Sequence, residues 1–282
     1  MININGTIIP SSEASISINN RGFTYGDAAF ETLRYAKGKI LFWEDHYFRL
    51  MATMRILRME IPMNFTPEYL EGEMIKLIEA NELANHPVRI KLMVSRKSGG
   101  YYTPETNDID YLIKVSQLER VEYQAITEKY VVDLYKDFYI PPGLLSNLKT
   151  NNRLINILAG IYAKEQQLEN CLLLNTDKMV VEALNGNIFL VKDNIIKTPP
   201  LSDGCLKGIM RKQIIDLVKA DGDLQLVEAS ISPFELQKAD ELFITNCIAG
   251  IAPVSQYRKK IFINSVAKRL TQALNSRLKD QL

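Results

Sequence analysis

Short apolar runs between residues 171 and 197 constrain the fold more than any other feature of the sequence. The turn dipeptides Asp177-Lys178 and Asp193-Asn194 lie between these runs. Runs this short, bounded by turn residues, are typical of buried strands rather than of helices. The second half of the chain is therefore predicted to contain a series of short strands, at residues 171–174, 179–183, 188–191 and 195–197.

The first third of the chain predicts a sheet with helices. Strands are expected at residues 4–9, 29–35, 40–43, 88–95 and 111–115. Helices are expected at residues 44–57 and after Thr66, an N-cap residue that is followed by Pro67 at the first helical position. This mixture of elements predicts one α+β layer unit.

The rest of the chain continues the mixed pattern. Further strands are expected at residues 130–134 and 241–245, and further helices from Asn152, from about residue 208 and at the C-terminus. Residues 117–128 contain neither a long apolar run nor clear turns. We therefore predict the α/β (α+β) class, with a small α/β domain at residues 1–118, a linker at 119–128 and a larger domain at 129–282.

Composition excludes several classes of function. Lys plus Arg number 34 and Asp plus Glu number 33, so no strong field would recruit nucleic acid or a membrane surface. The sequence shows neither a signal-peptide pattern nor an apolar run of membrane-spanning length, which predicts a cytoplasmic protein. Three dispersed cysteines and two histidines do not favour a metal site. An enzyme of this composition is expected to use a lysine, a carboxylate or a cofactor on a small molecule.

Lys149 stands in the segment SNLKTNNRL, where a helix is expected to begin at Asn151 or Asn152. The helix macrodipole disfavours positive charge at that end. In a partly buried pocket, desolvation drives a lysine toward the neutral form that Schiff-base chemistry requires. A solvated lysine at a loop–helix junction explains the same segment, so both interpretations stay open at this point.

Two more segments carry residues of the same kind. Glu182 lies inside an apolar strand, where a carboxylate needs a donor or a cation, unless the strand is a solvent-facing edge. A protonated cofactor ring nitrogen would also satisfy it. Gly208, Ile209 and Met210 begin a predicted helix, and the backbone amides at a helix start favour an anion.

In their order along the chain, these segments resemble the class IV (fold type IV) pyridoxal-phosphate enzymes. That family includes branched-chain aminotransferases, D-amino-acid aminotransferases and aminodeoxychorismate lyases. The resemblance implies a small N-terminal α/β domain, a larger C-terminal domain with a β-barrel-like sheet, pyridoxal 5′-phosphate as cofactor and a homodimer. It rests on NNRGFTYGDAAFETLR (19–34), HYFRL (46–50), KTNNRL (149–154), VEALNGNIFLVKDNIIKTPPL (181–201), LKGIMR (206–211) and ELFITNCIAGIAPV (241–254).

The resemblance also implies roles for individual residues. Lys149 would hold the cofactor and move protons, Glu182 would pair with the pyridine nitrogen, and Arg49 would grip the phosphate. The backbone at the helix start and a second loop would complete the phosphate site. This second set comprises Gly208, Ile209, Met210, Asn246 and Cys247. Met210 and Cys247 replace hydroxyl residues that are common in the family, which reduces the number of expected side-chain contacts.

Local features resemble the lyases more than the aminotransferases. Thr32 matches a lyase threonine near the reacting carbon, and Arg153 completes the lyase pattern K-x-x-N-R-L. The loop SRKSGG (95–100) and Asn246 also resemble the lyases, although each has an ordinary structural explanation. Glu31, in contrast, belongs to the F-E pattern of the aminotransferases.

We therefore expect a lyase that converts 4-amino-4-deoxychorismate to 4-aminobenzoate and pyruvate through a lysine Schiff base, a step of folate biosynthesis. The alternative is a class IV aminotransferase acting on branched-chain or D-amino acids with 2-oxoglutarate. An inactive binding protein of the same fold is a further alternative, but retention of Lys149, Glu182 and Arg49 argues against it. Expected substrate neighbours are Tyr25, Tyr101, Tyr102 and Arg153.

Overall fold

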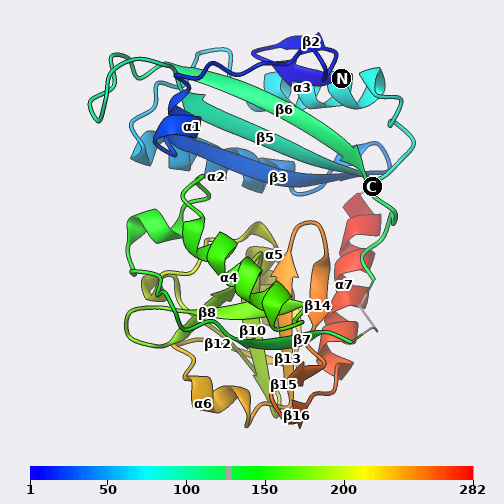
Figure 1. Ribbon diagram of the computed structural model, residues 1–282. Coiled ribbons are helices and arrows are strands. Elements are labelled where there is room, and N and C mark those ends of the chain that lie inside the picture. The colour runs from blue at the N-terminus through cyan, green and yellow to red at the C-terminus, as the bar shows by residue number, and fades with distance from the viewer. Residues whose placement is uncertain (125–128, 282) are drawn as a thin grey trace. The chain divides into compact units, whose positions relative to one another are not determined.

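The computed structural model describes residues 1–124 and 129–281. Their contacts divide the chain into two compact units (Figure 1). The N-terminal unit comprises Met1–Val121 and Lys149–Asn152, and the C-terminal unit comprises Glu122–Leu148 and Arg153–Leu282. Part of the predicted linker, residues 125–128, lies outside the described residues.

The N-terminal unit contains one antiparallel sheet with the strand order β2-β1-β6-β5-β3-β4. Its strands are β1 (Ile2–Ile4), β2 (Thr7–Ile9), β3 (Ala28–Ala36), β4 (Lys39–Ile40), β5 (Val88–Arg96) and β6 (Ile109–Gln117). Its helices are α1 (Arg21–Thr24), α2 (Trp43–Ile56) and α3 (Pro67–Ala80).

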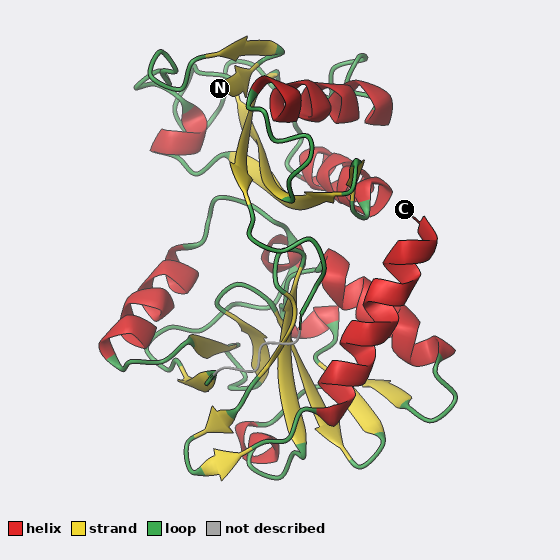
Figure 2. Ribbon diagram, turned by 90° about the vertical axis from the view of Figure 1, so that its right-hand side faces the viewer, coloured by secondary structure: helices red, strands yellow, loops and turns green. Residues whose placement is uncertain are grey.

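Helices α2 and α3 cover one face of this sheet (Figure 2). Alternate residues of β3 enter the core beneath them, among them Ala29 and Leu33. The intervening residues, including Phe30 and Thr32, therefore lie on the opposite face, because side chains alternate along a strand. As predicted, α3 begins after Thr66, whose hydroxyl accepts a hydrogen bond from the backbone N–H of Tyr69.

The C-terminal unit contains two five-stranded sheets, with the orders β12-β11-β10-β13-β14 and β16-β15-β7-β8-β9. Its strands are β7 (Val131–Leu134), β8 (Asn170–Leu174), β9 (Val180–Ala183), β10 (Asn187–Lys192), β11 (Ile195–Thr198), β12 (Gln225–Glu228), β13 (Glu241–Asn246), β14 (Gly250–Pro253), β15 (Gln256–Tyr257) and β16 (Lys260–Ile261). Its α-helices are α4 (Leu154–Glu165), α5 (Ile209–Ala220), α6 (Pro233–Leu236) and α7 (Ser265–Gln281). Two short 3-10 helices, η1 (Leu144–Asn147) and η2 (Leu201–Asp203), complete the unit.

The predicted series of short strands is confirmed as β8, β9, β10 and β11. The two sheets share one apolar core, to which residues of both β9 and β10 contribute. The chain passes from one sheet to the other at Gly186, where a side-chain Cβ would lie 2.6 Å from the carbonyl oxygen of Thr245. A glycine is therefore required at this crossing, because a larger residue would displace β13.

Three expected elements differ in the structure. The strand expected at residues 4–9 is a hairpin, because Asn5 and Gly6 adopt φ values of 51° and 86° and reverse the chain. The strand expected at 40–43 ends at Ile40, because α2 already begins at Trp43. The helix expected from Asn152 begins at Leu154, because the residues before it pair with β3.

None of the helices in the described part of the chain is both long and apolar enough to cross a lipid bilayer.

Candidate active site

Lys149 lies in an extended segment that is paired with β3. The backbone N–H of Phe30 donates to the carbonyl of Lys149 at 2.9 Å, and the N–H of Asn151 donates to the carbonyl of Ala28 at 3.0 Å. Thr150 forms an antiparallel bridge with Ala29. The lysine therefore belongs to the edge of a sheet rather than to the start of a helix, where the sequence pattern predicted it.

The face of β3 that carries Phe30 also carries the amine of Lys149. The Nζ atom of Lys149 lies 4.5 Å from the centroid of the Phe30 ring, and that of Lys91 lies 5.0 Å from the same centroid. Burial lowers the pKa of Lys91, and the positive charges of Arg89 and Lys114 lower it further. Thr32 is half-buried on this face, two residues from Phe30. The amines of Lys149 and Lys91 and the hydroxyl of Thr32 therefore lie on the same side of β3.

Glu31 points to the other face of β3, toward α2. Its carboxylate receives two hydrogen bonds from Arg49, with Nε at 2.7 Å and Nη2 at 2.5 Å, and His46 Nδ1 lies 2.7 Å away. Burial alone would raise the pKa of Glu31, but Arg49 and His46 together lower it to about 2. The paired carboxylate therefore fixes the orientation of the Arg49 guanidinium.

In the C-terminal unit, Glu182 is buried within β9 and accepts a hydrogen bond from the backbone N–H of Leu206 at 2.8 Å. The carbonyl of Leu206 in turn accepts from Nδ2 of Asn187 at 2.8 Å. These bonds connect the carboxylate to the segment that leads into α5. The alternative of a solvent-facing edge position for Glu182 is wrong, because its exposed fraction is 4%.

The helix start expected near residue 208 is confirmed, since Gly208 is the N-cap residue of α5. The N-cap glycine has no side chain to cap the helix, so the first backbone amides of α5 are suited to an anion. A Cβ at Gly208 would lie 2.0 Å from Oδ1 of Asn187, so the backbone approaches β10 closely. The side chains of Ile209 and Met210 are buried, and any contact with a ligand would come from their backbone.

A short loop follows β13, the strand next to β10 in the sheet. Oδ1 of Asn246 accepts from the backbone N–H groups of Ile248 at 3.0 Å and Ala249 at 2.8 Å. The hydroxyl of Tyr123 donates to the carbonyl of Cys247 at 2.8 Å. Asn187 of β10 is directly opposite Thr245, the last residue before Asn246, and its side chain also donates to the carbonyl of Leu206. Strand β10 therefore contacts both the end of β13 and the segment that leads into α5.

The expected substrate neighbours are only partly brought together. Tyr25 and Tyr102 form an aromatic pair with ring centroids 5.9 Å apart, and Tyr101 lies outside this pair; all three side chains are exposed. Arg153 is the N-cap residue of α4, and its guanidinium donates to the carbonyl of Leu148.

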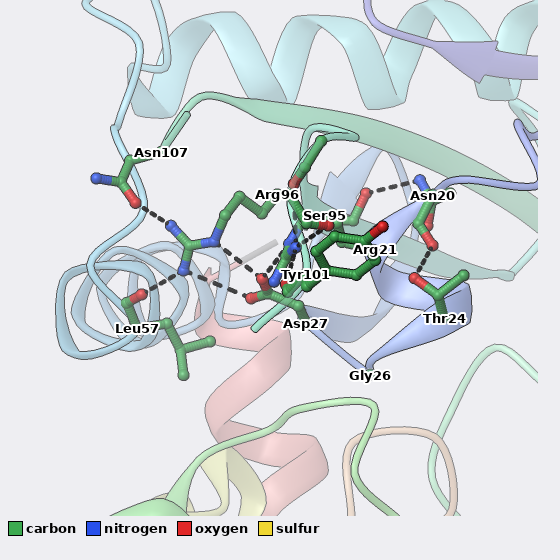
Figure 3. Close-up of polar contacts among 12 residues, drawn as sticks. Asn20, Arg21, Thr24, Gly26, Asp27, Leu57, Ser95, Arg96, Tyr101 and Asn107 are labelled. Carbon is green, nitrogen blue, oxygen red and sulfur yellow. Dashed lines mark hydrogen bonds and ion pairs between the residues drawn. The ribbon is translucent and has the colours of Figure 1, made fainter. Parts of the chain in front are cut away.

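A cluster of Arg21, Asp27 and Arg96 in the N-terminal unit was not predicted from the sequence (Figure 3). The sequence gives one indication of this cluster: Arg21 and Asp27 each lie next to a glycine in NNRGFTYGDAAF. Sequence reasoning also did not identify Asn187, which holds the start of α5.

Each unit, taken by itself, carries groups of a kind that binds a phosphorylated aldehyde cofactor. A lysine amine reacts with aldehydes, a buried carboxylate pairs with a protonated ring nitrogen, and a guanidinium and helix-start amides bind phosphate. Gly208 leaves room for close backbone approach, and the buried Glu182 carboxylate is fixed in place by the Leu206 amide. Among the described residues, no group of three or more His, Cys, Asp or Glu side chains is arranged to hold a metal ion.

Comparisons with known proteins identify relatives along most of the chain. The model of the family described as class IV amino-transferases matches residues 28–257. A Methanocaldococcus jannaschii protein, provisionally named a branched-chain-amino-acid aminotransferase, is 30% identical over 285 residues, covering 99% of this chain and 95% of the relative. The aminodeoxychorismate lyase of Vibrio harveyi is 27% identical over 248 residues, covering 86% of this chain and 88% of the relative.

Solved structures have the same fold. The branched-chain aminotransferase of Thermoproteus uzoniensis with norvaline superimposes with a TM-score of 0.86 at 23% identity, covering 96% of this chain and 92% of that structure. A second branched-chain amino acid aminotransferase, solved with pyridoxamine 5′-phosphate, superimposes with a TM-score of 0.85 at 24% identity, covering 98% of this chain and 94% of that structure. The predicted fold type is thereby confirmed.

Proposed function

The chain belongs to the class IV aminotransferase family, and from this premise we propose that it is a lyase converting 4-amino-4-deoxychorismate to 4-aminobenzoate and pyruvate. The prediction of an enzyme of this family is confirmed by the match. The observation that carries the finer proposal is the position of Thr32, which lies on the face of β3 that also holds Lys149.

Pyridoxal 5′-phosphate is the cofactor of this family, and one of the structural relatives was solved with its pyridoxamine form. We assign Lys149 to hold the cofactor and Glu182 to keep its ring nitrogen protonated. Arg49, the amides at the start of α5 and the loop at Asn246 and Cys247 are assigned to the phosphate. The burial of the Met210 side chain supports a phosphate site made there by backbone groups alone.

When bound, the cofactor supplies an electron sink for the carbon that bears the substrate amine. Lys149 would remove the proton from that carbon as a general base. The electron pair of this C–H bond then forms the ring double bond of the product as the neighbouring C–O bond to the enolpyruvyl group breaks. The substrate ring becomes aromatic, and the leaving group takes up a proton and departs as pyruvate. The Thr32 hydroxyl is assigned to donate a hydrogen bond to that leaving group.

Replacing Thr32 with valine tests this assignment, because valine keeps the shape of threonine but lacks the hydroxyl. We expect the rate of 4-aminobenzoate release to fall by about tenfold or more, in line with the loss of a positioned hydrogen-bond donor. Thr32→Ser restores the hydroxyl and is expected to recover most of the rate. Equal rates for Thr32→Val and the unaltered enzyme would remove the threonine from the mechanism.

An aminotransferase is the second candidate, and the 30% identity with the M. jannaschii relative favours it. Its first step would be the same proton removal by Lys149, but no leaving group departs, and Lys149 would then be the group that gives the proton back. Glu31, which orients Arg49, belongs to the pattern shared with aminotransferases. Assays with L-leucine, D-alanine and 2-oxoglutarate separate this candidate from the lyase.

Replacing Glu182 with glutamine removes the negative charge and keeps an oxygen that can accept from Leu206. We expect turnover to fall by about tenfold to a hundredfold, because the ring nitrogen loses the partner that keeps it protonated. Steady-state kinetics and the visible spectrum of the bound cofactor measure this change.

Glu241→Gln is a matched control for Glu182→Gln. Glu241 is also a buried carboxylate of the C-terminal unit, but it accepts from Ser265, Val266 and Ala267 at the start of α7. The control is expected to lower thermal stability and to leave turnover per folded molecule unchanged. The same loss of turnover in both variants would show that Glu182 acts only through stability.

A further inference from the structure

Two buried arginines of the N-terminal unit share one carboxylate. Nε of Arg21 lies 3.0 Å and Nε of Arg96 lies 2.9 Å from the same Oδ2 atom of Asp27 (Figure 3). The two guanidinium groups thus face a single negative charge. Buried arginines require further acceptors when carboxylates are too few, and backbone carbonyls supply them here.

Arg21 also donates hydrogen bonds, through Nη1, to the glycine-rich loop after β5. Its Nη1 donates to the carbonyls of Gly99 at 3.1 Å and Tyr101 at 2.6 Å, with that of Gly100 at 3.4 Å. Gly100 has a φ of 71°, and a Cβ there would lie 2.1 Å from the carbonyl of Thr103. The conformation of this part of the loop therefore depends on its glycines and on Arg21.

Arg96 holds the other end of the same loop. Its Nη1 donates to Oδ1 of Asn107 at 2.5 Å, and its Nη2 donates to the carbonyl of Leu57 at 2.6 Å. Figure 3 shows both arginines pointing toward Asp27. The loop between β5 and β6 is thereby fixed at both ends by one charged cluster.

The loop presents exposed aromatic rings rather than core residues. Tyr101 and Tyr102 are 83% and 92% exposed, so core packing does not explain why a buried arginine holds this segment. The Tyr102 ring pairs with that of Tyr25, and the Arg21 guanidinium carbon lies 4.8 Å from the Tyr25 ring centroid. Arg21 therefore supports both members of the aromatic pair, Tyr25 through its ring and Tyr102 through its loop.

This aromatic pair is connected to the segment that carries Lys149. Gly26, the residue after Tyr25, accepts a hydrogen bond from Nδ2 of Asn152 at 3.1 Å. A Cβ at Gly26 would lie 2.7 Å from Oδ1 of Asn152, so the Asn152 side chain lies close to the Gly26 backbone. Asp27 then leads directly into β3, which pairs with Lys149.

We propose that Arg21 is a positioning residue, which fixes Tyr25 and Tyr102 as a recognition surface for the part of the amine substrate distant from the reacting nitrogen. The proposal rests on the proposed function, because it takes an amine as the substrate. Preformed aromatic surfaces bind with little loss of side-chain entropy, so loosening the loop weakens substrate binding rather than the chemical step.

Arg21→Lys tests the proposal in the full-length protein loaded with pyridoxal phosphate. Lysine keeps the positive charge beside Asp27 but lacks the planar fork of donors that reaches the loop carbonyls. We expect faster amide hydrogen exchange in residues 98–103 and a KM for 4-amino-4-deoxychorismate raised by about fivefold or more, with kcat within about twofold. The affinity for pyridoxal phosphate, measured from its visible band, is expected to stay unchanged.

Arg34→Lys is the matched control. Arg34 is a buried arginine of the same unit, and it donates to the carbonyls of Arg120 and Val121 instead of to the loop. This control is expected to lose stability without a change in KM. A similar rise in KM for both variants would overturn the positioning role, because it would follow from general destabilisation.

Tyr102→Ala keeps the proposal testable if Arg21→Lys does not fold, since the Tyr102 side chain is exposed and its removal leaves the core intact. We expect it to raise KM by a similar factor without changing cofactor affinity. An unchanged KM in this variant of an active enzyme would overturn the inference alone. If the unaltered protein turns over neither 4-amino-4-deoxychorismate nor L-leucine nor D-alanine, the proposed function fails and the inference fails with it.

Discussion

Lys149→Ala is expected to abolish the visible absorption band of the lysine-bound cofactor and to lower turnover by about 10³-fold or more. The reason is that one amine is assigned both to hold the cofactor and to remove the substrate proton. The backbone on both sides of this amine is fixed against β3, because the carbonyl of Lys149 accepts from the N–H of Phe30 and the N–H of Asn151 donates to the carbonyl of Ala28. Absorption spectra, borohydride trapping with mass spectrometry and steady-state kinetics measure the change.

Lys91→Ala is the control for this prediction. Both amines lie over the Phe30 ring, at 5.0 Å for Lys91 and 4.5 Å for Lys149, so the control removes a similar charge from the same face. We expect Lys91→Ala to keep the visible band and the reducible adduct. An adduct that persists in Lys149→Ala and disappears in Lys91→Ala would transfer the role to Lys91.

Glu31→Gln is expected to lower the free energy of unfolding by about 3–5 kcal/mol, the usual cost of removing one partner from a buried ion pair. The carboxylate is 1% exposed and bonded to Arg49 and His46, so its loss leaves the Arg49 charge without this carboxylate in the core of the unit. Urea unfolding at neutral pH measures the difference. Since Arg49 is assigned to the phosphate, we also expect weaker binding of pyridoxal phosphate.

The pH dependence of stability provides a second readout for Glu31. Its pKa is lowered from 4.5 to about 2 in the folded chain, so the folded state favours the charged form. The resulting stability is fully present above pH 4.5 and is lost as the pH falls toward 2, by about 3 kcal/mol in total. Glu31→Gln should remove this part of the acid dependence. An unaltered acid profile in the variant would show that other carboxylates control acid unfolding.

Local patterns predicted the elements whose signals lie within a few residues. The strands β8 to β11 followed from apolar runs and turn dipeptides, and α3 followed from Thr66 and Pro67. The start of α5 was predicted correctly because Gly208 precedes an amphipathic segment. In each of these cases the neighbouring residues contain enough information to define the element.

The environment of Lys149 could not be predicted in this way. Its segment pairs with β3, which is distant in sequence, and this pairing overrides the apparent helix start at Asn151 or Asn152. The burial of side chains on α4 was likewise not predictable from the local sequence. Leu154, Ile157 and Ile161 recur at helical spacing but are exposed, while Ala159 and Ala163 are buried.

The partners within the charged clusters could not be predicted from the sequence either. Arg21 and Arg96 resemble ordinary surface charges until the fold brings them to Asp27. In the sequence, Glu31 is only part of the F-E pattern. Its partner His46 lies in a different element, α2. Side-chain partners of this kind depend on tertiary contacts, and local sequence patterns do not predict such contacts.

The products formed from 4-amino-4-deoxychorismate distinguish a lyase from an aminotransferase. The unaltered protein, loaded with pyridoxal phosphate, is incubated with this substrate, and 4-aminobenzoate is followed by fluorescence while pyruvate is measured in parallel. We expect equal amounts of both products. Absence of 4-aminobenzoate, with glutamate formed from 2-oxoglutarate and L-leucine or D-alanine by the same preparation, would contradict the lyase and establish an aminotransferase.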